Sequence, residues 1–337
     1  MKTGIITFHT ANNYGAVLQC YALSESIKDL GHEVELIDLP LHEKPKNLRP
    51  LLRNKVLSMA FSSFRDTFLP KVVKPSVEKD VYVFGSDQVW NPQITKKHCL
   101  SFFGSWVKNN KPKIAYAASF GLATWDFPKL TLEVKKELST FNALGIREST
   151  GVSICKDQFD LDTTQVLDPT LLRTDYSSVF KERKTSKSLV CYIFGKDEQK
   201  MDQLRNIANR LELQAVLLND ARFRRDIKSV LFPSVAKWLS YIESSQFVIT
   251  DSFHCMVFAI IFKKNFIAIP AIQARAGRMV SLLESLGLES RFFNTLEEAQ
   301  NSNVILQDID YSVVDKKLED LRANSLEFLK DSLDNVK

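Results

Sequence analysis

A histidine stands where two apolar segments meet in the last third of the sequence. Residues 247–250 are apolar enough for a short strand, Asp251 and Ser252 follow, and His254 opens an apolar helix. Backbone N–H groups at a helix start lack partners within the helix and carry the positive end of its dipole, so they attract anions. The imidazole adds a group that can donate a proton near neutral pH. The turn therefore predicts either a site for a phosphate or carboxylate, or a capped helix whose histidine only packs.

Three arginines are candidates to meet such an anion. Arg147 follows a short expected strand, and its fork of donors suits a phosphate or carboxylate. The alternative is an ordinary surface pair with Glu148. Arg275 and Arg278 follow the histidine helix, and Arg278 falls in the first turn of a helix that extends over 279–286. A cation is unfavourable there unless an anion compensates its charge.

Polar residues also follow two expected strands in the first hundred residues. The turn after the first strand carries four candidates: His9, Asn12, Asn13 and Tyr14. The loop after the strand at 81–85 carries Asp87, Gln88 and Trp90. A tryptophan ring offers a flat face to a sugar, while carboxylate and amide groups bond its hydroxyls. The alternative in both places is a capped turn, which in the second holds a half-buried Trp90.

Composition narrows the class of protein. The 337 residues are 45% hydrophobic and 25% charged, which is typical of a globular chain with about two domains. The net charge of +5 is mild and its positive residues are interspersed with acids, so we expect no nucleic-acid partner. The five cysteines form no C-x-x-C pair and no cluster with histidine, which argues against disulfides and zinc. No glycine-rich nucleotide motif occurs, and we expect neither a cofactor nor a metal.

Segment 41–75 differs from the rest of the chain. It holds eight Lys or Arg residues against Glu43 and Asp66, and its apolar residues from 57 to 68 share one helical face. One interpretation is an insertion that packs on the N-terminal sheet. The other is a basic amphipathic helix that rests on the anionic inner surface of the membrane.

The sequence contains no segment that predicts insertion into a membrane or export. No run approaches the roughly 20 apolar residues of a membrane span, and the first residues lack a signal-peptide pattern. We therefore expect a cytoplasmic protein, peripheral to the membrane if the second interpretation of segment 41–75 holds.

Strands and helices alternate along the chain. A strand at 3–8, a helix at 15–30 and a strand at 34–39 form one unit, and short strands continue to residue 167. After a basic joint at 181–187 the alternation begins again and continues to residue 269. We therefore expect an α/β protein with two Rossmann-like, doubly wound domains. Ligands bind beyond the carboxyl ends of such strands, so a cleft between the two domains is the expected site.

These patterns set the expected domain limits. Residues 1–180 form the N-terminal domain with the insertion 41–75, and residues 181–310 form the C-terminal domain. Residues 311–337 have the pattern of a charged amphipathic helix that packs back on one of the domains.

A series of short motifs runs in order from residue 7 to residue 288. They are Thr7-Phe8-His9 with Asn12–Gln19, Gly85–Asn91, Ala118–Gly121, Arg147-Glu148, Leu167–Thr170, Thr250–His254, and Arg278 with Leu282–Leu288. Each is weak alone, but the ordered set is specific and covers most of the chain. With it, the sequence resembles the polysaccharide pyruvyl transferase family.

This resemblance implies a fold and a reaction. The fold is similar to the two-domain glycosyltransferase fold called GT-B, with an acceptor-side N-terminal domain and a donor-side C-terminal domain. Family members transfer the enolpyruvyl unit of phosphoenolpyruvate to two sugar hydroxyls, which yields a cyclic pyruvate ketal and phosphate. The implied partners are phosphoenolpyruvate and a sugar of a polysaccharide or lipid-linked glycan precursor.

The resemblance also implies roles on the donor side. Arg147 and His254 serve the donor, and His254 either protonates its methylene carbon or only binds its phosphate. Relatives often carry an arginine two residues before this histidine, where this chain has Ser252. Ser252 is then a donor contact, and Arg275 or Arg278 replaces the missing guanidinium.

On the acceptor side, Asp87 is the candidate for taking the proton of the attacking hydroxyl. The expected sugar contacts are the residues of the two polar loops: His9, Asn12, Asn13, Tyr14, Gln88 and Trp90. Two other functions stay open at this point. One is GT-B-type glycosyl transfer from a nucleotide sugar, and the other is non-catalytic binding of an anion or glycan.

Overall fold

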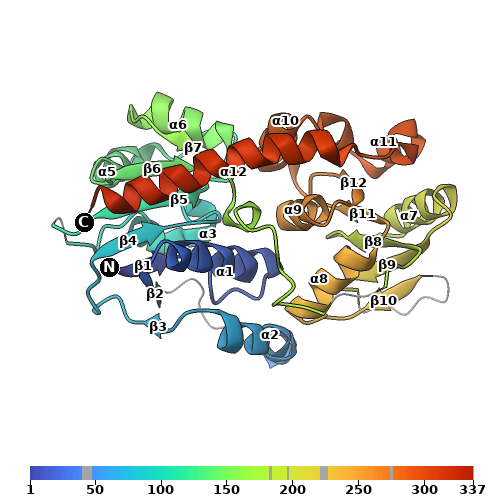
Figure 1. The fold of residues 1–337 in the computed structure, drawn as a ribbon, viewed down its shortest axis with the longest axis horizontal. Coiled ribbons are helices and arrows are strands. Elements are labelled where there is room, and N and C mark those ends of the chain that lie inside the picture. The colour runs from blue at the N-terminus through green and yellow to red at the C-terminus, as the bar shows by residue number, and fades with distance from the viewer. Residues whose placement is uncertain are drawn as a thin grey trace. The chain divides into compact units, whose positions relative to one another are not determined.

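The computed structural model describes residues 1–39, 48–108, 110–181, 184–195, 197–220, 227–273 and 276–336, with the backbone alone for 48–56. The chain divides into two compact units, whose elements are labelled in Figure 1. Unit 1 comprises Met1–Leu48, Phe68–Arg173 and Glu319–Lys337. Unit 2 comprises Arg49–Thr67 and Thr174–Leu318.

Unit 1 is built on a parallel sheet whose described strands are ordered β3-β2-β1-β4-β5-β6-β7. They are β1 (Lys2–Ile6), β2 (Glu33–Ile37), β3 (Val72–Val73), β4 (Val81–Phe84), β5 (Lys113–Ala118), β6 (Ala143–Ile146) and β7 (Thr164–Gln165). The chain moves outward from β1 to β3 and then returns to β4 on the other side of β1. Open parallel sheets bind ligands at such a switch point, which here lies between β1 and β4.

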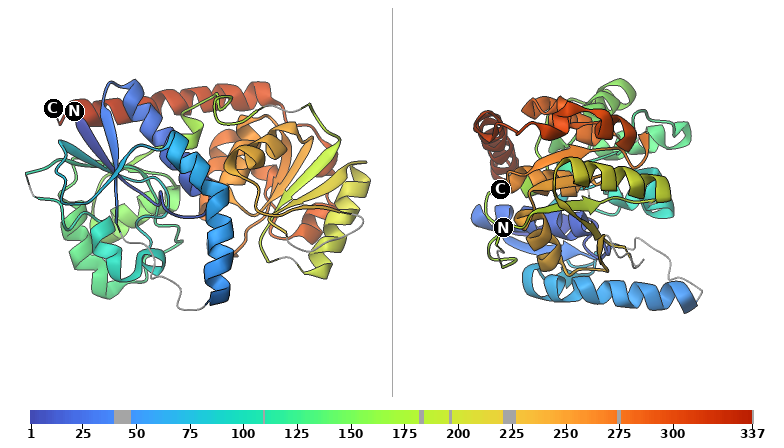
Figure 2. Two further views of the ribbon diagram at one scale, coloured as in Figure 1. Left: turned by 90° about the horizontal axis from the view of Figure 1, so that it is seen from below. Right: turned by 90° about the vertical axis from the view of Figure 1, so that its right-hand side faces the viewer.

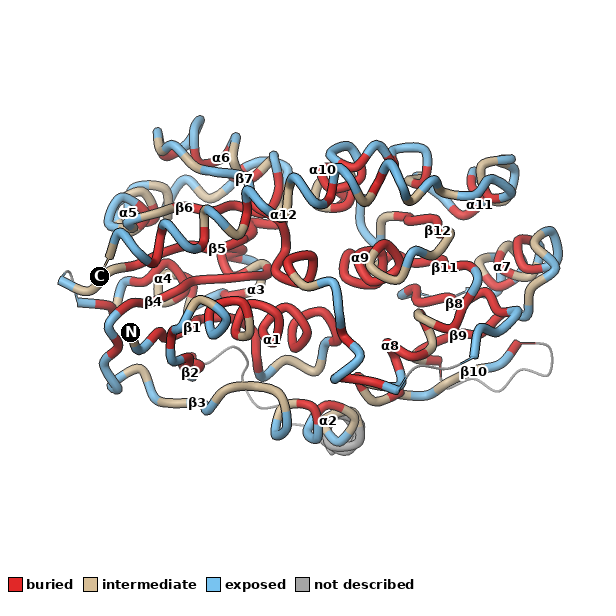
Figure 3. Tube along the Cα trace, viewed as in Figure 1, coloured by how far each residue is buried: buried red, intermediate tan, exposed pale blue. Residues whose placement is uncertain are grey.

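Helices cover both faces of this sheet, and its central strands are accordingly buried (Figure 3). The helices are α1 (Tyr14–Asp29), α3 (Pro92–Thr95), η1 (Lys96–His98), α4 (Cys99–Phe102), α5 (Pro128–Leu138), α6 (Ser149–Phe159), η2 (Pro169–Leu171) and part of α12 (Tyr311–Asp334). On one face α4, α5 and α6 enclose an aromatic core around Phe84, Trp90 and Phe120. On the other face lie α1 and the C-terminal part of α12 (Figure 1).

The C-terminal part of α12 is fixed to unit 1 by side-chain contacts. Ser325 Oγ accepts a hydrogen bond from the N–H of Leu167 at 3.0 Å, and the Phe328 ring lies against the backbone of Gly145 in β6. A Cβ at Gly145 would lie 2.6 Å from that ring, so only glycine allows this close packing. The residues of α12 up to Leu318 belong to unit 2.

Unit 2 is built on a second parallel sheet, whose described strands are ordered β10-β9-β8-β11-β12. They are β8 (Ser188–Tyr192), β9 (Gln214–Leu218), β10 (Lys228–Val230), β11 (Phe247–Thr250) and β12 (Asn265–Ala268). The strand order reverses between β8 and β11, so the switch point of this sheet lies there.

Unit 2 is also covered on both faces, and Figure 2 shows its elements from two further directions. Its helices are α2 (Leu48–Phe68), α7 (Glu198–Arg210), α8 (Val235–Ser244), α9 (Phe253–Ile261), α10 (Gly277–Leu286), η4 (Glu289–Arg291), α11 (Leu296–Asn301) and η5 (Asn303–Leu306). Apolar residues of α7 and α11 pack on one face of the sheet. On the other face Trp238 of α8 contacts Tyr192 of β8 and Phe258 of α9, with ring centroids 5.6 and 5.7 Å apart.

Within segment 41–75, helix α2 lies with a different part of the chain from the one we expected. This helix groups with unit 2 over Arg49–Thr67, not with the N-terminal sheet, and Met59 lines a groove with residues 230–234. Phe61 and Phe64 on its apolar face are buried, so that face is covered and favours the packed interpretation over the membrane-bound one. Residues 40–47 lie outside the described residues. Among the helices that the structure describes, none is long and apolar enough to cross a bilayer.

Candidate functional site

The turn after β1 and the loop after β4 are tied together at the switch point of unit 1. Thr7 Oγ1 donates a hydrogen bond to the Ser86 carbonyl oxygen at 2.9 Å, and Gln19 Nε2 donates to Thr7 Oγ1 at 2.7 Å. All three side chains are buried. These bonds fix the backbone of the two loops in which we expected the acceptor contacts.

The four candidates in the turn after β1 divide into two pairs. His9 and Tyr14 are buried, and His9 Nδ1 lies 3.2 Å from a backbone carbonyl oxygen two residues earlier. Asn13 is exposed and caps α1, because its Oδ1 accepts a hydrogen bond from the N–H of Ala16 at 3.2 Å. Asn12 is half-buried. Of this set, the two asparagines reach the surface.

Arg147 follows β6, and its guanidinium is buried among three carboxylates. Nη1 donates to Asp168 Oδ2 at 2.7 Å, Nη2 lies 3.5 Å from Asp87 Oδ1, and Nε lies 3.8 Å from Glu148 Oε2. Burial favours loss of the charge, but the carboxylates outweigh it and raise the pKa of Arg147. The side chain stays charged, and these three acids belong to the same unit as Arg147.

Asp168 and Glu148 are held by local donors. Asp168 Oδ1 accepts hydrogen bonds from the N–H and Oγ1 of Thr170 at 3.1 and 2.7 Å, and its Oδ2 also accepts one from Ser86 Oγ at 3.2 Å. Glu148 Oε1 accepts three, from Ser119 Oγ at 2.8 Å and from the next two backbone N–H groups at 3.1 Å each. Buried charges need such partners, which accounts for the polar residues at these strand ends.

Asp87 differs from the other two carboxylates because it reaches the surface. Its side chain is 12% exposed, compared with 0% for Asp168 and 1% for Glu148. Its Oδ1 accepts a hydrogen bond from the N–H of Gln88 at 2.8 Å. Its φ of 79° lies in the left-handed region, which residues with a Cβ adopt rarely and often at functional sites. Of these three acids, Asp87 is the one that can meet a ligand.

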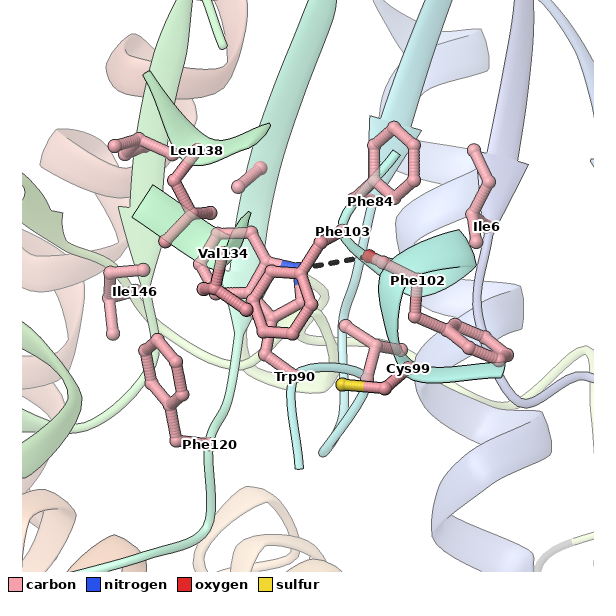
Figure 4. Packing of buried hydrophobic residues seen from close by; sticks show 14 of the residues in the cluster. Ile6, Phe84, Trp90, Cys99, Phe102, Phe103, Phe120, Val134, Leu138 and Ile146 are labelled. Carbon is pink, nitrogen blue, oxygen red and sulfur yellow. Dashed lines mark hydrogen bonds between the residues drawn. The ribbon is translucent and has the colours of Figure 1, made fainter. Parts of the chain in front are cut away.

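Trp90 lies in the core of unit 1, which corrects the expectation that its ring faces a sugar. Figure 4 shows the indole among buried side chains, with Nε1 donating to the Phe102 carbonyl oxygen at 3.1 Å. The ring is fully buried and stacks on Phe103 with centroids 5.5 Å apart. The loop after β4 turns back into the core here. The sequence alone does not distinguish a tryptophan in the core from one that faces a sugar.

Gln88 is half-buried and packs on the backbone of Gly121. Gly121 has a φ of 60°, and a Cβ there would lie 2.0 Å from Gln88 Oε1, so this position requires glycine. The same Oε1 accepts a hydrogen bond from Asn91 Nδ2 at 3.3 Å. The amide next to Asp87 is therefore fixed in place.

A hydrogen bond also spans the switch point of unit 2. Asp251 Oδ2 accepts a bond from the N–H of Phe194 at 2.7 Å, which ties the end of β11 to the end of β8. Thr250 Oγ1 donates to the Tyr192 carbonyl oxygen at 2.7 Å and accepts from the N–H of Ser252 at 3.0 Å. The turn that precedes α9 is thereby held rigidly on the sheet.

Ser252, His254 and Arg278 lie around the start of α9. Ser252 is the N-cap, with Oγ 3.5 Å from the N–H of Cys255, and His254 is buried in the first turn. Phe253 contacts both other side chains: its ring centroid is 5.2 Å from that of His254 and 5.6 Å from Arg278 Cζ. The structure thus brings an imidazole and a guanidinium to one helix start, through a phenyl ring that the sequence did not single out. Arg275 lies outside the described residues.

Cys255 is a neutral core residue. It is buried, and burial raises the pKa of its thiol to about 12. All five cysteines are buried and free of disulfides. The thiol that follows His254 is therefore not a nucleophile at neutral pH.

Phe194 is a candidate that the sequence analysis missed. Its side chain is 51% exposed and contacts the Tyr192 ring edge-on with centroids 5.3 Å apart. Strand β8 ends at Tyr192, so Phe194 lies beyond its carboxyl end. An aromatic side chain directly after a strand end was the available signal.

The described residues contain no group of three or more His, Cys, Asp or Glu side chains that could hold a metal ion. The polar groups at the two switch points are of types that exchange protons or bind anions. Unit 1 presents a carboxylate, and unit 2 presents an imidazole and a guanidinium at a helix start.

Solved structures of low sequence identity share this fold. UGT89C1 of Arabidopsis thaliana is 11% identical, with 99% of each chain covered and a TM-score of 0.56. A UDP-GlcNAc 2-epimerase of Methanocaldococcus jannaschii is 10% identical over 91% of this chain and 92% of its own, with a TM-score of 0.53. That of Neisseria meningitidis is 10% identical over 99% of each chain, with a TM-score of 0.52. The protein is therefore of the GT-B-like class, with two Rossmann-like sheets.

The family follows from a second comparison. The sequence profile of polysaccharide pyruvyl transferases matches residues 13–271, which include both switch-point loops after β4 and β11. The chain belongs to the polysaccharide pyruvyl transferase family. A search of curated proteins found no match.

Proposed function

We propose that this protein transfers the enolpyruvyl unit of phosphoenolpyruvate to two hydroxyls of one sugar and so forms a cyclic pyruvate ketal. The acceptor is a sugar of a polysaccharide or of a lipid-linked glycan precursor on the cytoplasmic side of the membrane. The observation that carries this proposal is the family match over residues 13–271, which contains Asp87, Arg147 and His254.

The donor binds at the start of α9 in unit 2. Phosphoenolpyruvate carries a phosphate and a carboxylate, so its site needs fixed positive charge and N–H donors. Ser252, His254 and Arg278 lie together there. Arg278 then holds one of the two anionic groups in place of the arginine that relatives carry at position 252. Arg275 remains a second candidate for this role.

The reaction needs one acid and one base. His254, as imidazolium, gives a proton to the methylene carbon, and positive charge develops at the adjacent carbon. The first sugar hydroxyl attacks that carbon while Asp87 takes its proton. The second hydroxyl then displaces the phosphate, which leaves with its bridging oxygen. The two protons lost by the sugar hydroxyls balance the proton added to the methylene carbon and the proton on the released hydrogen phosphate. If His254 only binds phosphate, another acid must supply the methyl proton.

The acceptor binds at the edge of unit 1, meaning the loops after β1 and β4, and units 1 and 2 act as the acceptor and donor sides. Asn12, Asn13 and Gln88 offer hydrogen bonds to sugar hydroxyls, since each is at least partly exposed. No resident cofactor or metal takes part in the proposed steps.

Calorimetry of the full chain with phosphoenolpyruvate, UDP and GDP tests the donor. We expect binding of phosphoenolpyruvate, and a glycan panel incubated with it should yield a product heavier by one pyruvate ketal. Glycosyl transfer from a nucleotide sugar is the second candidate, because UGT89C1 shares the fold over its whole length. Binding of a nucleotide without binding of phosphoenolpyruvate would favour that candidate and refute the first.

A further inference from the structure

Arg147 has a set of partners that a donor ligand would not need. Its guanidinium lies among Asp87, Glu148 and Asp168, so three carboxylates surround one cation. With all four groups charged the cluster has a net charge of about −2, and the Arg147 side chain is only 2% exposed. A donor with both a phosphate and a carboxylate that approached this guanidinium would meet more negative than positive charge.

The two deeper acids anchor the guanidinium. Asp168 receives the shortest contact, 2.7 Å from Nη1, and is itself held by Ser86 and Thr170. Glu148 is bonded by the loop at 119–121 and lies 3.8 Å from Nε. The hydrogen bond from Nη1 to Asp168 holds one side of the guanidinium, Glu148 adds a nearby opposite charge, and the other terminal nitrogen, Nη2, lies toward Asp87.

Nη2 is directed at Asp87. It lies 3.5 Å from Asp87 Oδ1, the oxygen that also accepts a hydrogen bond from the N–H of Gln88. Asp87 is the acid of this cluster that reaches the surface, and its left-handed backbone sets the position from which the side chain extends. The guanidinium therefore connects the fully buried side chain of Asp168 to that of Asp87, which is 12% exposed.

We propose that Arg147 is a positioning residue for Asp87 and not a ligand of the donor. This rests on the proposed function, in which Asp87 takes the proton of the attacking hydroxyl. With Oδ1 held by the guanidinium and a backbone N–H, Oδ2 is the oxygen that we assign to take the hydroxyl proton. Lysine cannot replace arginine here, because one ammonium group cannot reach Asp168 and Asp87 in the fork geometry of Nη1 and Nη2.

A double-mutant cycle on the full chain tests this assignment. Arg147→Lys should lower kcat by about tenfold to a hundredfold and leave the Kd of phosphoenolpyruvate within about twofold. Asp87→Asn should lower kcat by about a hundredfold or more. The double variant should be no slower than Asp87→Asn within about threefold, because residues that act through one another are not additive. Arg173→Lys, which changes an arginine paired with Asp29 outside the cluster, is the control and should keep normal kcat.

Two results would overturn the proposal. One is a Kd for phosphoenolpyruvate raised tenfold or more in Arg147→Lys with kcat unchanged at saturation, which marks a donor ligand. The other is a double variant whose loss is the product of the two single losses. If Arg147→Lys does not fold, as judged by circular dichroism, Asp168→Asn replaces it. That variant frees the guanidinium from its anchor, and the same loss of kcat with unchanged donor affinity is expected.

Failure of the proposed function gives a different pattern. The wild-type protein would then neither bind phosphoenolpyruvate nor form a ketal. In that case the same cycle is measured with the nucleotide sugar that binds, since an acceptor hydroxyl must also lose its proton in glycosyl transfer. Additive losses there would again reject Arg147 as a positioning residue.

Discussion

At the switch points of the two sheets, hydrogen bonds tie neighbouring strand ends together in a similar way, but the functional side chains around them differ. In unit 1 a bond from Thr7 to the Ser86 carbonyl ties β1 to β4, and in unit 2 a bond from Phe194 to Asp251 ties β8 to β11. Beyond these ties, unit 1 carries acids around a buried guanidinium. Unit 2 carries an imidazole, a serine cap and a half-buried guanidinium at a helix start.

This difference indicates which reactant each edge suits. An excess of carboxylates favours taking a proton from a neutral hydroxyl and disfavours a dianion. A helix start with His254 and Arg278 favours an anion and can supply a proton. This difference supports our proposal that the sugar binds at the edge of unit 1 and phosphoenolpyruvate at the edge of unit 2.

The largest expected effect is the loss of stability on removal of the Trp90 side chain. It tests whether this ring belongs to the core of unit 1 or to the acceptor site. Trp90→Ala should lower the free energy of unfolding by about 3–5 kcal/mol, because it leaves a large cavity among aromatic side chains. Urea unfolding measures this loss. Trp90→Phe should leave the KM of the acceptor unchanged, and Trp106→Phe, which removes a similar bond to the Ser101 carbonyl, is the control. A tenfold change in acceptor KM in Trp90→Phe with normal stability would place the ring at the sugar.

The next effect concerns the acid at the edge of unit 2. His254→Gln should lower turnover by at least about a hundredfold, the scale for loss of acid catalysis, with phosphate release as the measurement. His98→Gln, a half-buried histidine in unit 1 outside both edges, should behave as wild type. Near-normal turnover in His254→Gln would remove the imidazole from the chemistry. A large rise in donor Kd with unchanged kcat would make it a phosphate ligand only.

A smaller effect is expected from the guanidinium at the same edge. Arg278→Met should weaken binding of phosphoenolpyruvate by about tenfold to a hundredfold, as for loss of one charge-assisted contact, and calorimetry measures it. Lys263→Met provides the comparison, because that exposed cation pairs with Asp315 away from the start of α9. Unchanged affinity in Arg278→Met would leave Arg275 as the donor-binding arginine.

The smallest expected effect is a loss of stability at alkaline pH, to which one buried thiol in each unit contributes. Burial raises the pKa of the Cys155 and Cys255 thiols from 9.0 to about 12, so the folded state keeps them protonated. This contribution is fully present below about pH 9 and is lost as the pH rises toward 12. We expect each thiol to lower the free energy of unfolding by about 1 kcal/mol at pH 10 relative to pH 7.5, as measured by urea unfolding. Cys255→Ala should reduce the drop in the free energy of unfolding between pH 7.5 and pH 10. An unchanged drop would contradict a raised pKa of the Cys255 thiol.

Much of the fold could be predicted from the sequence, because long apolar periodicities set its main elements. The helix over Tyr14–Asp29 and the central strands form within a few residues of where the pattern places them. Strands β3 and β10, with two and three residues, are too short to show a period. The placement of α2 with unit 2 depends on tertiary packing, which no local pattern reports.

The candidate site was predictable in position but not in detail. The sequence predicted that Asp87, Arg147 and His254 follow strands, and in the structure they follow β4, β6 and β11. Partner choice was not predictable: sequence gives no sign that Arg147 faces three acids instead of solvent, or that Trp90 points inward. Both outcomes depend on how residues distant in the chain come together.

Phosphoenolpyruvate labelled with ¹⁸O at its bridging oxygen tests the central claim most directly. In the proposed reaction the C–O bond of the donor breaks, so the released phosphate should carry the label and the glycan should gain one unlabelled pyruvate ketal. Mass spectrometry reads both products from one incubation of the full chain. Label in free pyruvate, or phosphate release without a ketal on any glycan of a broad panel, would contradict pyruvyl transfer.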